Sequence, residues 1–172
     1  PSLRQSVIYN DANDYNVLVS LDRHHPTVPG VIDFGDAVYS HTIHELAIAA
    51  AYLAMDKPDP LSTIAQLVKG FHAEFPLTEQ EVSALFSLIG ARLLISVTCS
   101  AINLTENPEN TYLQISDRPA WALMEKMRNT PDGLALATAA EQAHLWRHPP
   151  VGADVGHRVP RHLGRHEPHR IA

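Results

Sequence analysis

Residues 9–36 have the sequence YNDANDYNVLVSLDRHHPTVPGVIDFGD, and the expected fold and chemistry of the chain rest on this segment. It contains two short apolar runs, at residues 17–21 and 31–34, joined by a polar connection rich in His and Pro. Apolar runs on either side of such a connection predict a β-hairpin with a long loop. The polar side chains at the edges of these runs, Asp11, Asn16 and Asp33, are the candidates for chemistry.

The spacing and order of these three residues suit phosphoryl transfer. That reaction needs a carboxylate that accepts or orients the proton of the attacking hydroxyl, and hard oxygen ligands that hold Mg²⁺ against the nucleotide phosphates. Asp11 can supply the carboxylate that takes the proton, and Asn16, five residues later, can supply one Mg²⁺ ligand. Asp33, which begins the sequence D-F-G, can supply the other Mg²⁺ ligand. The two motifs on successive strands are more specific together than either is alone.

The sequences I-Y-N-D-A-N-D-Y-N-V-L-V and G-V-I-D-F-G-D resemble the C-terminal lobe of the aminoglycoside phosphotransferase and choline kinase family, relatives of the protein kinases. The stretch D-F-G-D-A-V-Y-S-H-T-I-H-E-L-A-I-A-A-A-Y looks most like the hydroxylysine kinase branch, and the resemblance covers about residues 7–128. It implies that Asp11 is the catalytic base and that Asn16 and Asp33 bind Mg²⁺ with ATP or GTP. The acceptor would be a hydroxyl of a small amine or amino acid, and Asp14 could face its ammonium groups, although a solvated turn residue is the simpler interpretation.

The chain departs from the family pattern at two points. Tyr9 stands where the family usually has His, two residues before the catalytic Asp, so the loop is expected to be supported differently. No glycine-rich loop, no strand Lys for the nucleotide phosphates and no helix Glu to pair with that Lys is recognisable, so the N-terminal lobe is expected to be missing. The sequence therefore predicts a truncated product with half of the nucleotide cleft, inactive by itself.

From residue 42 onward the apolar period becomes that of helices. Thr42 with Glu45 and Thr78 with Glu81 have the spacing of a capping box, which predicts a helix start at each. Glu45 lies near the D-F-G turn, so it could also brace the catalytic loop. Arg92, within the longest predicted helix, is expected to pair with an acid or a carbonyl, because an unpaired buried charge is costly. Helices are predicted to end at three places: at Pro58 and Pro60, at Pro76, and at Asn107 and Pro108. Helices are predicted to start after Asp59 and at Pro119.

Together these elements predict an α+β fold that is mostly α-helical, the C-terminal lobe of a protein-kinase-like fold, over residues 1–143. Residues 144–172 contain six of the eleven His, five Arg and four Pro without a sustained period, which indicates an irregular or disordered tail, or a shifted reading frame. His162, His166 and His169 have spacings that could bind a transition metal, but nothing predicts the rigid support that such a site needs.

Composition narrows the classes of partner. Hydrophobic residues make up 45% and charged residues 19%, as in soluble globular proteins. Residues 1–143 hold 8 Lys and Arg against 17 Asp and Glu, which argues against nucleic acid binding.

No signal peptide is recognisable and no apolar run reaches the length of a bilayer span, the longest being residues 46–55 and 84–97, so no membrane partner is expected. The single Cys99 predicts a cytoplasmic location, no internal disulfide, and a small buried residue in a helix.

Two other classes of function stay open. A non-catalytic helical remnant or interaction domain of a kinase-like protein would share these features. Loss of an N-terminal lobe would expose apolar surface near Ile8 and Val31, so self-association is expected in that case. The chain could also be one piece of a larger protein in which such a kinase is joined to another enzyme. The catalytic interpretation predicts a small-molecule hydroxyl substrate and a nucleotide as partners.

Overall fold

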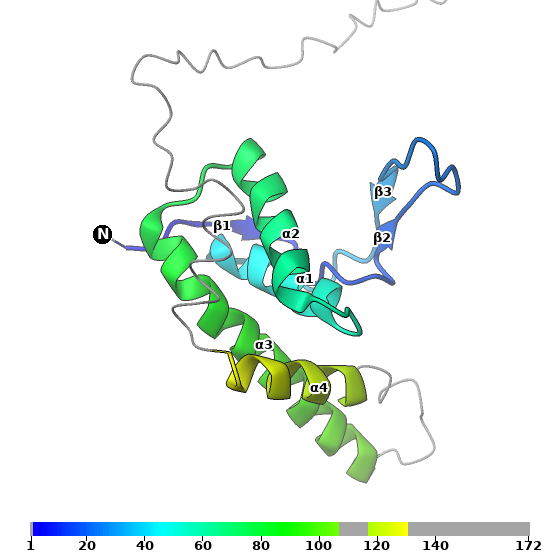
Figure 1. The fold of residues 1–172 in the computed structure, drawn as a ribbon, viewed down its shortest axis with the longest axis vertical. Helices are drawn as coiled ribbons and strands as arrows, with labels where there is room; N and C mark the ends of the chain where they lie inside the picture. The colour runs from blue at the N-terminus through cyan, green and yellow to red at the C-terminus, as the bar shows by residue number, and fades with distance from the viewer. Residues whose placement is uncertain (1, 107–116, 131–172) are drawn as a thin grey trace, which may run out of the picture.

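The computed structural model describes residues 2–106 and 117–130, which form a mixed α/β structure dominated by helices (Figure 1). This agrees with the predicted fold class. The boundary at residue 143, the tail with its His residues, and the predicted helix end at Asn107 and Pro108 lie outside the described residues. The described elements are β1 (Gln5–Ile8), β2 (Val17–Leu18), β3 (Gly30–Val31), β4 (Val38–His41), α1 (Ile43–Ala54), α2 (Pro60–Glu74), α3 (Glu79–Glu106) and α4 (Asp117–Arg128).

The predicted hairpin is present but shorter than expected. β2 and β3 pair antiparallel, with Val17 opposite Val31 and Leu18 opposite Gly30. The strands do not extend over residues 17–21 and 31–34, because the hairpin projects from the helices (Figure 1) and its outer apolar residues gain nothing from burial. Leu21, for example, is almost fully exposed.

A second antiparallel pair joins β1 to β4, with Val38 directly opposite Ile8. This pair brings the chain before the first motif next to the chain after D-F-G. Ile8 itself is buried, but its neighbour Val7 on β1 and Val31 on β3 are exposed, so apolar surface is present near both predicted positions.

Helix α1 is central. It lies against both α2 and α3. Small side chains on this helix allow its neighbours to approach closely, and four of them are almost completely inaccessible to solvent: Ala47, Ala50, Ala51 and Ala54. The helix ends at Ala54, before the predicted stop at Pro58, and Asp56 follows in the left-handed region with φ 57°.

The predicted capping box at the start of α1 is wrong. Thr42 already has helical backbone angles (φ −55°, ψ −33°), so it cannot present its hydroxyl to the first turn as an N-cap residue does. Its Oγ1 instead lies 2.8 Å from Oγ of Ser6 on β1. Glu45, the other half of the expected box, bonds to the loop after β1.

The starts of α2 and α3 follow the sequence rules. Asp59 accepts a hydrogen bond from the Ser62 N–H at 3.0 Å, and Pro60 occupies the first helical position. At α3 the capping box is complete: the Thr78 N–H donates to Glu81 Oε2 (2.9 Å), and the Glu81 N–H donates to Thr78 Oγ1 (3.3 Å). Both predicted starts are therefore confirmed.

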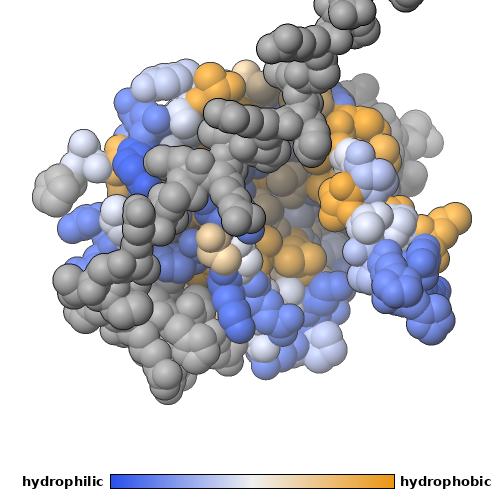
Figure 2. All heavy atoms as spheres, turned by 90° about the horizontal axis from the view of Figure 1, so that it is seen from above, coloured by the Kyte–Doolittle hydropathy of each residue, from blue (hydrophilic) through white to orange (hydrophobic). Residues whose placement is uncertain are grey.

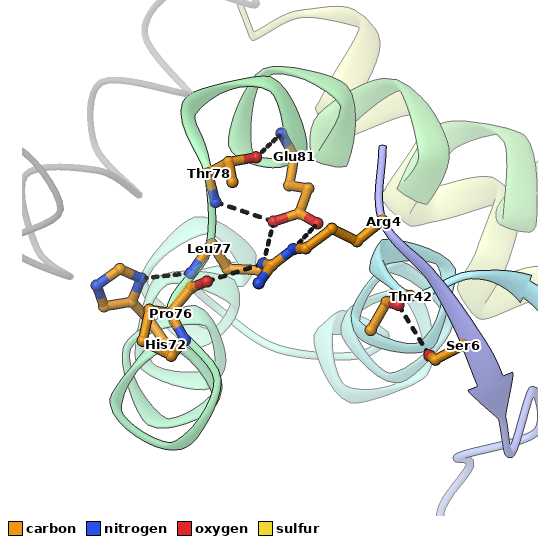
Figure 3. A network of polar contacts seen from close by, with 8 residues as sticks. All are labelled: Arg4, Ser6, Thr42, His72, Pro76, Leu77, Thr78 and Glu81. Carbon is orange, nitrogen blue, oxygen red and sulfur yellow. Dashed lines mark hydrogen bonds and ion pairs between the residues drawn. The ribbon is translucent and has the colours of Figure 1, made fainter. Parts of the chain in front are cut away.

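An ion pair joins the residue directly before β1 to the start of α3 (Figure 3). Arg4 donates to both carboxylate oxygens of Glu81, at 2.8 and 2.5 Å, and to the Pro76 carbonyl at 2.8 Å. Its guanidinium lies over the Phe75 ring, 4.1 Å from the centroid. Glu81 is only 1% exposed, so Arg4 compensates a carboxylate that the fold has removed from water.

Helix α3 corrects two expectations. By length and composition it is apolar enough to cross a membrane, so the expectation that no run reaches that length is wrong; core helices of soluble proteins share these properties. One of its faces, including Leu85, Ile89 and Leu93, is buried in the core. Cys99 lies off that face and is exposed, not buried as predicted.

Candidate functional site

The loop between β1 and β2, residues 9–16, is called the Asp11 loop below. The Asn13 side chain shapes it, because its Oδ1 accepts hydrogen bonds from the N–H groups of Tyr15 (2.8 Å) and Asn16 (3.1 Å). This turn directs the chain inward at Asn16, whose side chain is buried, and leaves Asp14 exposed on the outside. Asp14 thus lies on the solvent side of the loop.

Asn16 and Asp11 are in direct contact. The Asn16 amide nitrogen donates to the Asp11 backbone carbonyl (3.1 Å) and to Asp11 Oδ2 (2.7 Å). With its nitrogen used in this way, the amide presents its carbonyl oxygen Oδ1 as an acceptor. A hard cation such as Mg²⁺ takes that kind of oxygen ligand. The observed orientation therefore fits the predicted metal role of Asn16.

Asp33 reaches the same region through strand pairing. The Ile32 N–H donates to the Asn16 carbonyl at 3.0 Å, which places the start of D-F-G beside the end of the Asp11 loop. Asp33 has a left-handed backbone (φ 59°) and its Oδ1 accepts from the Gly35 N–H at 3.3 Å. A Cβ at Gly35 would lie 3.3 Å from that oxygen, which favours glycine there.

The candidate metal site depends on few protein ligands. The described residues contain no group of three or more His, Cys, Asp or Glu side chains placed to hold a metal. Asn16 and Asp33 would have to share the ion with oxygens of a nucleotide and of water, which is how Mg²⁺ is usually bound.

Tyr9 links the two motifs. Its hydroxyl donates to the Ile32 carbonyl, and its ring meets the Phe34 ring edge-on with centroids 5.1 Å apart. Burial, and then the negative charges of Asp11 and Asp33, raise the pKa of the Tyr9 hydroxyl. Tyr9 therefore supports the Asp11 loop from the D-F-G side.

We expect Tyr9→Phe to loosen this link while keeping the aromatic contact. Loss of the hydroxyl leaves the Ile32 carbonyl without its side-chain donor, which should lower the free energy of unfolding. Urea unfolding of the wild type and the variant measures this difference. Tyr39→Phe, at an exposed side chain on β4, is the matched control and should leave stability unchanged. Equal stability of the wild type and Tyr9→Phe would contradict the structural role.

Glu45 contacts the Asp11 loop, which is the second of the two roles that the sequence left open for it. Its Oε2 accepts from the N–H groups of Tyr9 (2.6 Å) and Asn10 (3.0 Å). Asn10 has a left-handed backbone with φ 69°, a conformation that costs free energy in any residue with a side chain. Glu45 stabilises that conformation from the first turn of α1, directly before Asp11.

We expect Glu45→Ala to lower the turnover number of the complete polypeptide by about tenfold, because the two N–H groups lose their shared acceptor and the loop can relax. Glu45→Gln keeps an acceptor oxygen and should retain most of the activity. Steady-state assays of both variants, with circular dichroism to check folding, measure the difference. Wild-type turnover by a folded Glu45→Ala would show that the bonds do not position the loop.

Arg92 of α3 also reaches this site. Its Nη2 lies 3.7 Å from Asp11 Oδ1 and donates to the Tyr52 hydroxyl at 2.7 Å. The expectation that Arg92 pairs with an acid is confirmed. The sequence could not identify the acid, because the two residues are far apart along the chain and only helix packing brings them together.

Similarity to known proteins agrees with this geometry. Residues 1–81, which include Asp11, Asn16 and Asp33, match the phosphotransferase enzyme family. They belong to that family. No solved structure matches the chain.

Several curated proteins that are similar to this chain are hydroxylysine kinases. The mouse protein is 31% identical over 130 residues, which cover 72% of this chain and 35% of the relative. The Xenopus laevis protein is 31% identical over 134 residues (73% and 36%), and the Danio rerio protein 34% over 122 residues (69% and 34%). The resemblance to the hydroxylysine kinase branch is confirmed. The matched part spans about a third of the length of these relatives.

Proposed function

We propose that the complete polypeptide transfers the γ-phosphoryl group of ATP or GTP to a hydroxyl of a small amine or amino acid, with hydroxylysine as the first candidate. The contact between Asn16 and Asp11 is the main support. It orients the amide with its oxygen available to a metal ion and, at the same time, fixes a carboxylate oxygen at 2.7 Å. The names of the relatives support the acceptor class.

In the proposed reaction Asp11 takes the proton of the acceptor hydroxyl. The acceptor oxygen then forms a bond to the γ-phosphorus, and the bond from that phosphorus to the oxygen bridging the β-phosphate breaks, which leaves a nucleoside diphosphate. Asn16 and Asp33 would hold Mg²⁺, which when bound offsets the negative charge of the phosphates. Exposed Asp14 would attract ammonium groups of the acceptor, because an opposite charge steers a ligand toward the loop.

A transfer assay tests this function. The complete polypeptide is incubated with Mg²⁺ and γ-labelled ATP or GTP, and with hydroxylysine, choline, homoserine or an aminoglycoside. We expect labelled product with hydroxylysine. Absence of transfer to every acceptor, from either nucleotide, would refute the proposed reaction.

The 172-residue chain is proposed to be inactive by itself. Calorimetry with Mg²⁺ and either nucleotide should show weak binding or none, because no glycine-rich loop or phosphate-binding Lys is recognisable in it. Tight binding would overturn this part of the proposal.

One observation favours a non-catalytic alternative. Apolar side chains are exposed on the strands and the hairpin, among them Val7, Val19, Leu21 and Tyr39. In Figure 2 apolar (orange) side chains lie among hydrophilic ones on the side that carries the hairpin. Exposed apolar surface of this kind often binds a partner or a second copy. A concentration-dependent sedimentation coefficient together with a negative transfer assay would favour the alternative.

A further inference from the structure

We propose that Arg92 is a positioning residue for Asp11: from α3 it fixes the carboxylate on the side opposite to Asn16. The inference rests on the proposed function, in which Asp11 accepts a proton. It concerns a residue outside the segment 1–81 that matches the phosphotransferase family.

The two oxygens of Asp11 have different partners. Oδ2 accepts a hydrogen bond from the Asn16 amide at 2.7 Å, and Oδ1 faces Arg92 Nη2 at 3.7 Å. The second distance exceeds that of a hydrogen bond, so Arg92 attracts the carboxylate by charge without occupying a lone pair of Oδ1. Oδ1 therefore stays available to accept the proton of a hydroxyl, while Oδ2 is held.

The position of Arg92 is itself fixed by α1. Tyr52 accepts a hydrogen bond from Nη2 through its hydroxyl, and the guanidinium carbon lies 5.2 Å from the centre of the Tyr52 ring. The ring face adds a cation–π attraction. Arg92 thus has two independent contacts with one side chain, which limits the positions from which it can reach Asp11.

Partial burial strengthens the attraction between the Arg92 and Asp11 side chains. The Arg92 and Asp11 side chains are 23% and 20% exposed, so water screens their attraction less than it screens a surface pair. Arg92 Nε is buried without a hydrogen-bond partner in the described residues. Burial of an unsatisfied N–H costs free energy. The pair with Asp11 is a contact that offsets this cost.

The test uses Arg92→Met in the complete polypeptide, with hydroxylysine and Mg²⁺-ATP or Mg²⁺-GTP. Met keeps the apolar part of the side chain and removes the charge. We expect kcat to fall roughly 10- to 100-fold, as for other residues that orient a reacting group, while KM for both substrates stays unchanged. Arg92→Lys, which restores a cation, should recover part of kcat. Arg128→Met, at a 72% exposed Arg on α4, is the matched control and should keep wild-type kinetics.

Failure of this inference differs from failure of the proposed function. An active wild type with an equally active, folded Arg92→Met would overturn the positioning role and leave the reaction intact. If Arg92→Met does not fold, Tyr52→Phe decides, because it keeps the ring but removes the hydroxyl that holds Nη2. Unchanged kcat in that variant would also overturn the role.

If the wild type shows no kinase activity, the contact between Arg92 and Asp11 can still be tested by a measurement that does not depend on turnover. A double-mutant cycle in urea unfolding between Arg92→Met and Asp11→Asn should show coupling between the two residues. Additive changes in the free energy of unfolding would show that the two side chains do not interact.

Discussion

Asp11→Asn should lower kcat of the complete polypeptide by roughly 10²- to 10⁴-fold, the range over which general bases contribute to catalysis. An amide has no basic oxygen to take the proton of the acceptor hydroxyl. It does keep an acceptor oxygen for the Asn16 amide, which now donates to Asp11 Oδ2 at 2.7 Å. The fold should therefore be preserved, and the loss should appear in kcat. Steady-state kinetics with hydroxylysine as acceptor measure it.

Two comparisons make the Asp11 result specific. Asp22→Asn changes an exposed carboxylate in the hairpin loop, where an amide oxygen can still accept from the His24 and His25 N–H groups, so kinetics should not change. Thermal unfolding should show that Asp11→Asn melts within a few degrees of the wild type. An Asp11→Asn protein with wild-type kcat would exclude Asp11 as the base.

Arg4→Met should lower the free energy of unfolding by about 2–3 kcal/mol. Removal of one partner from a fully buried ion pair costs about 3–5 kcal/mol. The effect here should be smaller because Arg4 is 40% exposed, although Glu81 at 1% has little access to water. Met fills the space of the Arg stem but leaves the Glu81 carboxylate with the Thr78 N–H as its remaining donor in the described residues. Urea unfolding at neutral pH measures the loss.

The same pair predicts a dependence on pH. Burial opposes ionisation of Glu81, but hydrogen bonds from Arg4 and Thr78 outweigh it and hold the pKa of Glu81 below its ordinary value of 4.5. A carboxyl with a lowered pKa in the folded state stabilises the protein above pH 4.5, and this contribution is lost as the pH falls through the lower folded value. Wild-type stability should therefore decrease in acid, and the decrease should be shallower in Arg4→Met.

The surface pair on α4 is the control for this prediction. Arg128 and Glu125 are 72% and 60% exposed, and their side chains lie 3.2 Å apart. Arg128→Met should change stability by less than about 0.5 kcal/mol, because water screens such pairs. Similar losses for Arg4→Met and Arg128→Met would show that the Arg4 contact contributes no more than a surface pair.

The two capping boxes show what sequence spacing can predict about this fold. Thr78 with Glu81 forms the box, but Thr42 with Glu45 does not, although the residue types and spacing are the same. The difference is tertiary. β1 passes beside the start of α1 and offers Ser6 to Thr42, and the loop after β1 offers its backbone N–H groups to Glu45. Local rules predicted both helices, and contacts from distant residues decided which bonds formed.

The residues of the candidate site also fall into two groups, those that the sequence could identify and those that it could not. Asp11, Asn16 and Asp33 could be identified because phosphoryl transfer needs those residue types in that order, and strand pairing brings their segments together. The residues that hold them, Glu45 and Arg92, come from helices, and neither the capping-box spacing of Glu45 nor the helix position of Arg92 specifies which atoms they contact. Their role depends on how α1 and α3 pack, which the periodicity of a sequence does not specify.

Helix α1 has a consequence for heat inactivation. Glu45 bonds to the Asp11 loop and Tyr52 holds Arg92, and these two residues are seven positions apart, on one face of a helix whose opposite contacts form the core. The loop therefore has little freedom to melt while α1 remains folded. Residual activity after heating and the ellipticity of the helices should fall with one common midpoint, and the α1 amides should be among the slowest to exchange with deuterium.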